Sequence, residues 1–519
     1  SGASRMCIAA PAEAAVRRSG AAASADAQYS REVVAERLWR RAAHDAALTS
    51  AAAARSGLCI ALKRSDLDSA RELSLPIYAD DASFVFDGAQ CELSSRDCSR
   101  TAILNTSGGG GGAAAGAAAP LLDAALVRSG NRSVMFVLHD AVPSAGAPGG
   151  GLMATMQVAE SLAARGTIVR IAALHEAVPI LAEQFPAIAA RKLLVGFSRE
   201  SIETELVPML GEFHVAVATF FPTVWIVRKA LRRFPALSGI YFVQDYEPLF
   251  PLPAAYSSAA KFSYALTSVA PRMKIVSYSD WIRRELLEKH GVASAKVTAA
   301  VDHSRFTVDL DDDHHREKDS SGGAVVIAAM VRPSTPRRAA TQTVAVLAAL
   351  ATRLGDAVAI RTFGCTLDAL SAECAGGSCA GDTFGRRHRH LGELDRDGVA
   401  TALRESDIFI DLSHWQAFGF TGLEAMASGA VPLLTNRGGV GEYARHGENA
   451  LLVDTTNFDR VVELAAGLAV DSPRRARMRA AALATASVFT LDRVAASWRV
   501  ALDDATRTQR ERLHAIDIF

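Results

Sequence analysis

The chain alternates apolar segments of strand length with helical segments, and this alternation constrains its fold more than any other feature. A strand is predicted at 133–139, followed by glycines at 149–151, an amphipathic helix and a second strand at 167–174. Strands that alternate with helices form parallel sheets whose faces the helices cover. We therefore expect an α/β fold with a parallel sheet from about residue 132 onward.

A second region of the same kind lies further along the chain. Buried strands are predicted at 407–412 and 431–435, with a tight turn at 418–422 and a helix at 423–428 between them. The N-terminus of that helix would face the carboxyl end of a strand, where its free N–H groups and positive dipole end suit a diphosphate. Glu424, expected in the first helical turn, is placed to accept hydrogen bonds from a ribose diol.

Two arginines follow another predicted buried strand, at 324–331. Arg332 and Arg337 lie in the sequence RPSTPRR directly after it. Guanidinium groups bind phosphate oxygens through forked hydrogen bonds, so this pair is suited to a leaving diphosphate. The alternative is a pair of solvated arginines in a proline-rich loop, which their position at a strand's carboxyl end disfavours.

The segment that begins at Trp415 resembles the signature of family-four retaining glycosyltransferases of the GT-B fold. That signature is Glu-x7-Glu around a Phe-Gly turn, then Glu-Ala-Met-Ala-x-Gly, then Gly-Gly-x-x-Glu. Segments 277–292 and 299–306 resemble the family's exit from its first domain, and the resemblance covers most of 133–500. It implies two Rossmann-like domains that face each other across a cleft, with the last helices crossing back to the first domain.

The resemblance also implies roles for individual residues. It assigns catalytic roles to Arg332, Arg337, Gln416 and Glu424. It assigns donor binding to the turn and the later glycine pair, namely Phe418, Gly419, Phe420, Thr421, Gly422, Gly438 and Gly439. Gln416 stands where the family has its first Glu. An amide can bind the hydroxyls of a donor sugar but cannot act as a nucleophile.

Residues near two other strand ends are candidates for the acceptor side of the cleft. Gly150 and Gly151 follow the first strand, and Gln244 and Asp245 follow the apolar residues 241–243. A flexible glycine loop is the alternative for the first pair. For Asp245, with Glu247, the alternative is the capping of a turn before Pro248.

The function that the resemblance implies is retaining transfer of a hexose from a nucleotide-diphosphate sugar to a glycan or lipid-linked acceptor. Bacterial rhamnosyl- and mannosyltransferases of polysaccharide synthesis are the resembling group. A catalytically inactive GT-B sugar-binding or scaffolding module and a nucleotide-sugar epimerase are the alternatives. No cofactor and no catalytic metal are expected, because the nearest Asp-x-Asp match to a metal site at a strand end, Asp309 to Asp311, lies in a charged run that is typical of a linker.

Charge and composition limit the partners and the compartment. Lys+Arg and Asp+Glu number 56 each, which disfavours a broad nucleic-acid footprint. The basic amphipathic segment 223–235 predicts either contact with an anionic membrane surface or a solvated helix face. The expected location is the cytoplasm or the cytoplasmic membrane face. Glycosylation patterns at Asn105 and Asn131, and two close cysteine pairs that are either disulfides or loop thiols, leave the secretory lumen open.

The resulting domain organisation has six parts. They are an accessory region of unknown role (1–106), a Gly/Ala-rich linker (107–131), an N-terminal acceptor domain (132–308), a charged linker (309–323), a C-terminal donor domain (324–490) and the returning helices (491–519).

Overall fold

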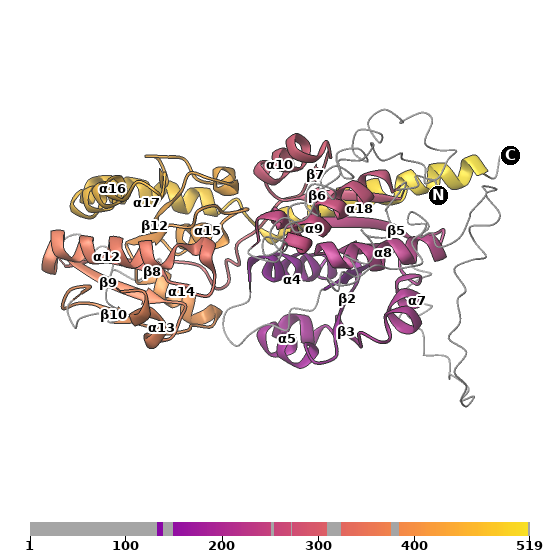
Figure 1. Ribbon diagram of the computed structural model, residues 1–519, viewed down its shortest axis with the longest axis horizontal. Helices are drawn as coiled ribbons and strands as arrows, with labels where there is room; N and C mark the ends of the chain where they lie inside the picture. The colour runs from indigo at the N-terminus through magenta and orange to yellow at the C-terminus, as the bar shows by residue number, and fades with distance from the viewer. Residues whose placement is uncertain are drawn as a thin grey trace, which may run out of the picture.

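The computed structural model describes residues 132–138, 149–250, 254–270, 272–308, 323–374 and 383–516. The predicted accessory region, the Gly/Ala-rich linker up to residue 131 and the charged run 309–322 lie outside the described residues. Cys91, Cys98, Asn105 and Asn131 lie there too. Within the described part, two lobes lie side by side, as Figure 1 shows.

The N-terminal lobe is built on a parallel seven-stranded sheet with the order β3-β2-β1-β4-β5-β6-β7. Its strands are β1 (Ser133–Val137), β2 (Ile168–Leu174), β3 (Leu194–Phe197), β4 (Val215–Ala218), β5 (Ser238–Val243), β6 (Met273–Ser277) and β7 (Ala295–Lys296). Its helices are α4 (Gly150–Ala163), α5 (Val178–Gln184), α6 (Pro186–Ala190), α7 (Val207–Leu210), α8 (Phe221–Arg233), α9 (Ala254–Val269) and α10 (Asp280–His290).

The C-terminal lobe repeats this plan with a parallel six-stranded sheet of order β10-β9-β8-β11-β12-β13. Its strands are β8 (Val325–Met330), β9 (Val358–Phe363), β10 (Arg389–His390), β11 (Ile408–Asp411), β12 (Val431–Thr435) and β13 (Leu451–Val453). Its helices are α12 (Ala340–Leu354), α13 (Leu367–Ala372), α14 (Arg396–Arg404), α15 (Phe420–Ala427), α16 (Phe458–Val470) and α17 (Ser472–Ala486), and the last helix of the chain, α18 (Leu491–Ile516), follows them in sequence. The prediction of two Rossmann-like domains is confirmed.

Each sheet reverses its strand order at one point, between β1 and β4 in the first lobe and between β8 and β11 in the second. In open parallel sheets, ligands bind outside the carboxyl ends of the strands at such a reversal. Strands β1, β4, β5, β11 and β12, in the middle of the two sheets, are buried throughout, which explains their nearly continuous apolar sequences. The fold therefore marks one position in each lobe for a site.

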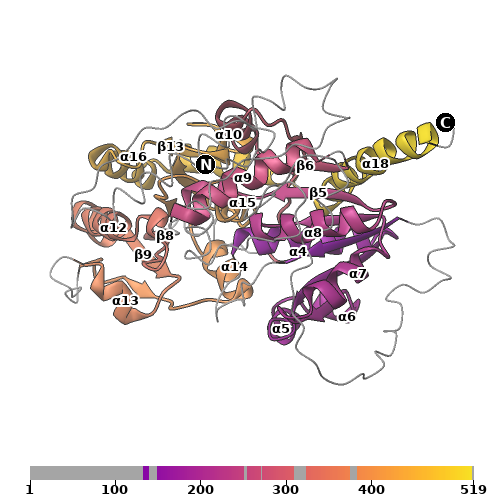
Figure 2. The ribbon, with the colours of Figure 1, turned by 45° about the vertical axis from the view of Figure 1, so that its right-hand side comes forward.

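The last helix, α18, lies on the N-terminal lobe although it follows the C-terminal lobe in sequence (Figures 1 and 2). Trp498 is fully buried there, with its ring centroid 5.6 Å from that of Phe136 and 4.9 Å from that of Phe242. Asp503 of the helix forms an ion pair with Arg132 at the start of β1. Burial of a tryptophan between two aromatic rings ties this helix firmly to the first sheet.

The start of helix α15 differs from the prediction. The helix begins at Phe420, three residues before the expected start, because Gly419 has a φ of +88° and acts as the N-cap. A glycine reaches this left-handed conformation without steric cost. Glu424 therefore lies in the second helical turn and not in the first.

The basic segment predicted at 223–235 forms helix α8, and its apolar face packs into the lobe. Val224 and Val227 are fully buried. Lys229 forms an ion pair with Glu203, so Arg232 and Arg233 are the exposed cations of this helix. Among the described residues, no helix is both long and apolar enough to span a bilayer. Contact of α8 with a membrane stays a prediction.

Cys374 is disulfide-bonded, while its pairing with Cys379, one of the two close cysteine pairs of the sequence, stays a prediction. The other half of that pair, Cys379, lies outside the described residues.

Candidate functional site

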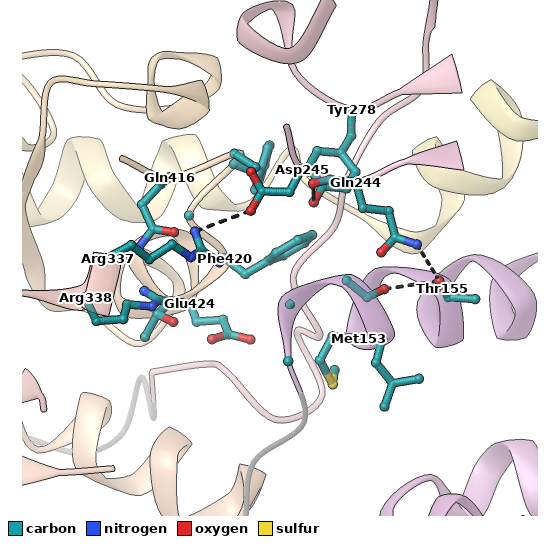
Figure 3. A pocket seen from close by; sticks show the side chains of 18 of the residues that line it. Met153, Thr155, Gln244, Asp245, Tyr278, Arg337, Arg338, Gln416, Phe420 and Glu424 are labelled. Carbon is teal, nitrogen blue, oxygen red and sulfur yellow. Dashed lines mark hydrogen bonds and ion pairs between the residues drawn. The ribbon is translucent and has the colours of Figure 1, made fainter. Parts of the chain in front are cut away.

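A cavity of about 430 Å³ lies where the carboxyl ends of the two sheets face each other. Figure 3 shows side chains from both lobes pointing into it. From the N-terminal lobe it is lined by Leu138, Gly149, Gly150, Gly151, Leu152, Met153, Thr155, Thr219, Phe220, Gln244, Asp245, Glu247, Phe250 and Tyr278. From the C-terminal lobe and the connection to it come Phe306, Met330, Arg332, Arg337, Arg338, Arg396, Val399, Gln416, Ala417, Phe418, Gly419, Phe420, Thr421 and Glu424.

The turn before α15 brings the helix N-terminus to the cavity. Phe418, Gly419, Phe420 and Thr421, all predicted to bind the donor, line it. The hydroxyl of Tyr443 donates a hydrogen bond of 2.6 Å to the carbonyl oxygen of Gly419, which fixes the turn. The N–H group of Gly422 donates to the carbonyl oxygen of Gly419 at 3.0 Å, and the first two N–H groups of a helix lack a partner within it, so this end of α15 can offer donors to a ligand.

Three predicted donor-binding glycines are not among the residues that line the cavity, and the structure gives them a packing role. A Cβ atom on Gly438 would lie 2.0 Å from the carbonyl oxygen of Gln416, and one on Gly439 1.9 Å from that of Ala417. One on Gly422 would lie 2.5 Å from the hydroxyl of Tyr443. At Gly438 and Gly439 only a missing side chain lets two backbone segments approach so closely, whereas Gly422 leaves room for the side chain of Tyr443.

Three arginines of the segment after β8 line the cavity, one more than predicted. Arg332 is partly desolvated, and this burial, with the charge of Arg337, lowers its pKa. The Nη1 atom of Arg337 lies 3.4 Å from Oδ2 of Asp245, an ion pair that joins the two lobes and appears as a dashed line in Figure 3. The sequence reasoning missed Arg338, although it stands beside Arg337 in the same basic run.

Arg338 is held by a buried carboxylate at the end of β11. Its Nη1 atom lies 2.9 Å from Oδ2 of Asp411. Desolvation lowers the pKa of Arg338 while Asp411 raises it, and a guanidinium keeps its charge in such a setting. No motif in the sequence marks Asp411, because an acidic residue at the end of an apolar strand is common and only the fold brings Arg338 to it.

The side chain of Gln416 lies at the cavity but turns its amide nitrogen away from it. Nε2 donates to Oδ2 of Asp411 at 2.7 Å and to Oγ of Ser413 at 3.0 Å. Both hydrogens of the amide nitrogen are therefore used by the protein. The predicted contact of this side chain with donor hydroxyls is thus limited to its oxygen atom, Oε1.

Glu424 faces the cavity from the second turn of α15, close to a cluster of charges. Desolvation raises its pKa to about 7, against the lowering effect of Arg396. Arg396, the first residue of α14, was also missed. Its Nη1 atom lies 3.6 Å from Oδ2 of Asp302, and its Nη2 atom is buried without a hydrogen-bond partner among the described residues.

The predicted acceptor-side residues come together opposite the arginines. Gln244 donates from Nε2 to Thr155 Oγ1 at 3.0 Å and to the carbonyl oxygen of Thr219 at 3.2 Å, while its Oε1 atom is buried without a partner in the described residues. A Cβ atom on Gly151 would lie 2.6 Å from that oxygen, and one on Gly150 3.4 Å from the ring of Phe420. The two glycines thus leave room between the helix termini of the two lobes.

The two carboxyl groups on this side are buried. Desolvation raises the pKa of Asp245, against the effect of Arg337, and raises that of Glu247 to about 8. Oδ1 of Asp245 accepts a hydrogen bond of 2.8 Å from the backbone nitrogen of Tyr246, and the hydroxyl of Tyr241 donates to Glu247 at 2.6 Å. Asp245 therefore both caps its turn, as the alternative proposed, and lines the cavity.

The described residues hold no cluster of three or more His, Cys, Asp or Glu side chains with the geometry of a metal site.

Comparison with known proteins finds similarity to glycosyltransferases in part of the chain. Residues 383–485 match the family described as glycosyl transferases group 1. The chain is 26% identical over 265 residues, 50% of its length, to the O-antigen biosynthesis protein RfbC of Myxococcus xanthus. It is 35% identical over 86 residues, 16% of its length, to the lipopolysaccharide core biosynthesis mannosyltransferase LpsB of Rhizobium meliloti. The matched segments make up only 18% of RfbC and 24% of LpsB.

Among solved structures, HepE of Anabaena, in complex with UDP and glucose, has a similar fold. It superposes with a TM-score of 0.57 at 14% identity, covering 72% of this chain and 100% of HepE. The chain thus has the GT-B fold, and its residues 383–485 match the glycosyl transferases group 1 family.

Proposed function

We propose that this protein is a metal-independent, retaining glycosyltransferase that moves a hexose from a nucleotide-diphosphate sugar to a glycan or lipid-linked saccharide. The observation that carries the proposal is the shared cavity, in which Arg332, Arg337 and the N-terminal turn of α15 meet. Its volume of about 430 Å³ lies within the range of roughly 300–1,000 Å³ that is usual for small-molecule sites. HepE structures contain UDP and UDP-glucose, so UDP sugars are the first donors to test.

The diphosphate of the donor would lie between the arginines and the α15 N-terminus. The guanidinium groups of Arg332 and Arg338 are desolvated, and charged hydrogen bonds are stronger in such surroundings than in water. Positive charge fixed in place before the reaction stabilises the charge that grows on the leaving diphosphate. This arrangement would supply the stabilisation that a metal ion provides in other transferases.

Glu424 would hold the ribose of the donor. Its carboxyl group lines the cavity from the same helix whose N-terminus would meet the diphosphate. A nucleoside diphosphate has its ribose directly beside the phosphates, so one short helix can contact both. With a pKa of about 7, the carboxyl group accepts hydrogen bonds from hydroxyls when ionised and also donates one when protonated.

The reaction would break the bond between the anomeric carbon and the diphosphate oxygen and form one bond from that carbon to the acceptor oxygen. The proton of the acceptor hydroxyl would pass to the leaving phosphate oxygen. Gln416 cannot serve as a nucleophile, because its side chain is an amide. Attack from the face that the diphosphate leaves retains the anomeric configuration.

A panel of UDP, GDP and dTDP sugars tests the proposal, with release of free nucleotide as the readout. We expect turnover with one nucleotide carrier and a saturable affinity for its diphosphate. Glu424→Ala should weaken nucleotide binding by about tenfold or more in calorimetry, since a charged hydrogen bond contributes about 1.5–3 kcal/mol. Glu448→Ala is the control, because Glu448 is exposed and does not line the cavity.

The competing function is a GT-B module that binds a nucleotide sugar without transferring it. The engagement of the Gln416 amide with Asp411 favours this alternative, because it leaves one atom of that side chain for the sugar. Saturable binding with no nucleotide release from any carrier, with or without saccharide acceptors, would establish it. The location at the cytoplasmic face stays a prediction.

A further inference from the structure

Asp411 lies directly behind two side chains that line the cavity, and it does not line the cavity itself. Its Oδ2 atom accepts hydrogen bonds from Arg338 at 2.9 Å and from Gln416 at 2.7 Å. Its Oδ1 atom accepts from the backbone nitrogen of Ser413 at 3.0 Å. With 6% of its surface exposed, this carboxylate is a shared anchor for a cation and an amide.

The anchor determines which atom of Gln416 is left for a ligand. Nε2 has two hydrogens, and Asp411 and Ser413 accept both. A rotation of the amide by half a turn would place Oε1 against Oδ2 of Asp411, two acceptors at hydrogen-bonding distance, which is repulsive. The Asp411 charge therefore keeps the amide in one orientation, with Oε1 as the free acceptor.

The same geometry explains why the residue at 416 is an amide. A glutamate there would bring a second carboxylate to within about 3 Å of Asp411, and two carboxylates at such a distance share one proton. Arg338 alone would then face both charges. With glutamine, the network holds one carboxylate and one guanidinium, and the negative charge stays in the layer behind the cavity wall.

We propose that Asp411 is a positioning residue that holds the Gln416 amide oxygen and the Arg338 guanidinium toward the bound donor. This inference rests on the proposed function, because it takes the donor to be the ligand of the cavity. Figure 3 shows Gln416, Arg337 and Arg338 side by side on the C-terminal wall. Arg338 then adds to the charge that meets the diphosphate, and Gln416 accepts a hydrogen bond from a sugar hydroxyl.

A double-mutant cycle tests the anchor without any substrate. The four proteins are the natural chain, Gln416→Glu, Asp411→Asn and the double variant, with thermal midpoints measured from about pH 5.5 to 8.5. In Gln416→Glu the carboxylate pair has a raised folded-state pKa. The thermal midpoint of the Gln416→Glu protein should therefore fall, relative to that of the natural chain, as the pH rises. The double variant keeps the original charge and should lose this extra pH dependence.

Asp407→Asn combined with Gln416→Glu is the matched control. Asp407 precedes the same strand at its opposite end, where Oδ2 accepts from the backbone nitrogen of Val326 at 2.7 Å. This control should keep the full pH dependence of Gln416→Glu. Equal pH dependence in the natural chain and in Gln416→Glu, or a double variant as sensitive as Gln416→Glu, would overturn the anchor.

Activity gives the second readout. With the donor found in the nucleotide-release panel, Gln416→Glu should lower kcat/KM by about tenfold at pH 8, and Asp411→Asn in the same chain should restore most of it. Restored stability without restored kcat/KM would show that Asp411 stabilises the fold and does not position the site. Failure of the proposed function is distinct, because the natural chain would then release no nucleotide while the thermal cycle still reports on the anchor.

Discussion

The two lobes share one architecture and differ in the charge that they present to the cavity. The C-terminal wall carries four guanidinium groups, those of Arg332, Arg337, Arg338 and Arg396. Among the described residues, the N-terminal wall carries the carboxyl groups of Asp245 and Glu247 and no lysine or arginine. One wall suits an anionic leaving group, and the other suits a ligand that is neutral where it meets the wall.

The difference shows where function resides in a repeated fold. Much of each wall is formed by segments that follow the carboxyl ends of strands, either at the reversal of strand order or, as for Asp245 and Glu247 after β5, beside it. Such segments vary without disturbing the sheet, so the same frame supports different chemistry on each side. The N-terminal wall also carries the rings of Phe220 and Phe250, stacked with centroids 6.1 Å apart. An apolar surface of this kind suits the C–H face of a sugar or an apolar carrier.

The largest effect should come from breaking the buried ion pair of the C-terminal wall. Arg338→Ala leaves the Asp411 carboxylate buried without its cation, which typically costs about 3 kcal/mol of unfolding free energy. Urea denaturation measures the loss. Arg338→Lys keeps the charge and should retain part of the stability. Equal unfolding free energies for Arg338→Ala and the natural chain would show that the ion pair between Arg338 and Asp411 does not stabilise this wall.

Donor affinity should depend strongly on the other arginines of this wall. Arg332→Ala should weaken the binding of UDP, or of whichever nucleoside diphosphate binds, by roughly tenfold to a hundredfold, because a charged hydrogen bond contributes about 1.5–3 kcal/mol. The affinity of the matching nucleoside should stay unchanged in the same calorimetric titrations. Arg389→Ala, which removes an exposed arginine of β10, serves as the control. A uniform loss for nucleoside and diphosphate would contradict the assignment of a phosphate contact.

The carboxyl group of Glu424 should give this wall a pH dependence. Its folded-state pKa of about 7 lies above the usual 4.5, so the folded protein binds this proton more tightly than the unfolded chain does. The stability linked to it is complete below about pH 4.5 and is lost as the pH rises through about 7. Glu424→Gln removes the titrating group. The decrease of the unfolding free energy between about pH 4.5 and 7 should therefore be smaller in this variant, by about 1–3 kcal/mol. If the unfolding free energies of the natural chain and of Glu424→Gln depend on pH in the same way, burial does not raise the pKa of Glu424.

The smallest effect on donor binding is expected on the N-terminal wall. Asp245→Asn removes the ion pair with Arg337 across the cavity, whose atoms are 3.4 Å apart. We expect the affinity for the nucleoside diphosphate to change by less than about threefold, which corresponds to less than about 0.7 kcal/mol. Calorimetric titration of Asp245→Asn and Arg332→Ala with the same nucleoside diphosphate compares the two walls directly. A tenfold loss of affinity for the nucleoside diphosphate in Asp245→Asn would show that both walls hold the diphosphate. The two walls would then not have separate roles.

The sequence predicted the elements that depend on local pattern. The strands expected at 324–331, 407–412 and 431–435 appear as β8, β11 and β12 with ends that differ by at most a residue. A buried parallel strand is apolar along its whole length, so its pattern is strong in the sequence. The start of α15 was wrong by three residues, because Gly419 caps the helix directly and the turn is shorter than expected.

The candidate site was only partly predictable. Arg332, Arg337 and Glu424 were named from a family signature and from strand ends, and the structure brings them to one cavity. Arg338 was missed although it stands beside Arg337, and Arg396 and Asp411 were missed because nothing in their neighbours along the chain distinguishes them. Their importance depends on contacts between residues far apart in sequence, such as the 73 positions that separate Arg338 from Asp411.

The sequence by itself determined the two parallel sheets, the glycine turn before α15 and the basic segment after β8. Periodicity, glycine and charge act over a few neighbouring residues, so they can be read without a fold. The tertiary structure decided which arginine is anchored, which atom of Gln416 is free, and which glycines pack backbone against backbone. These outcomes depend on distances of a few ångströms between distant segments, and on burial that changes the strength of each charge.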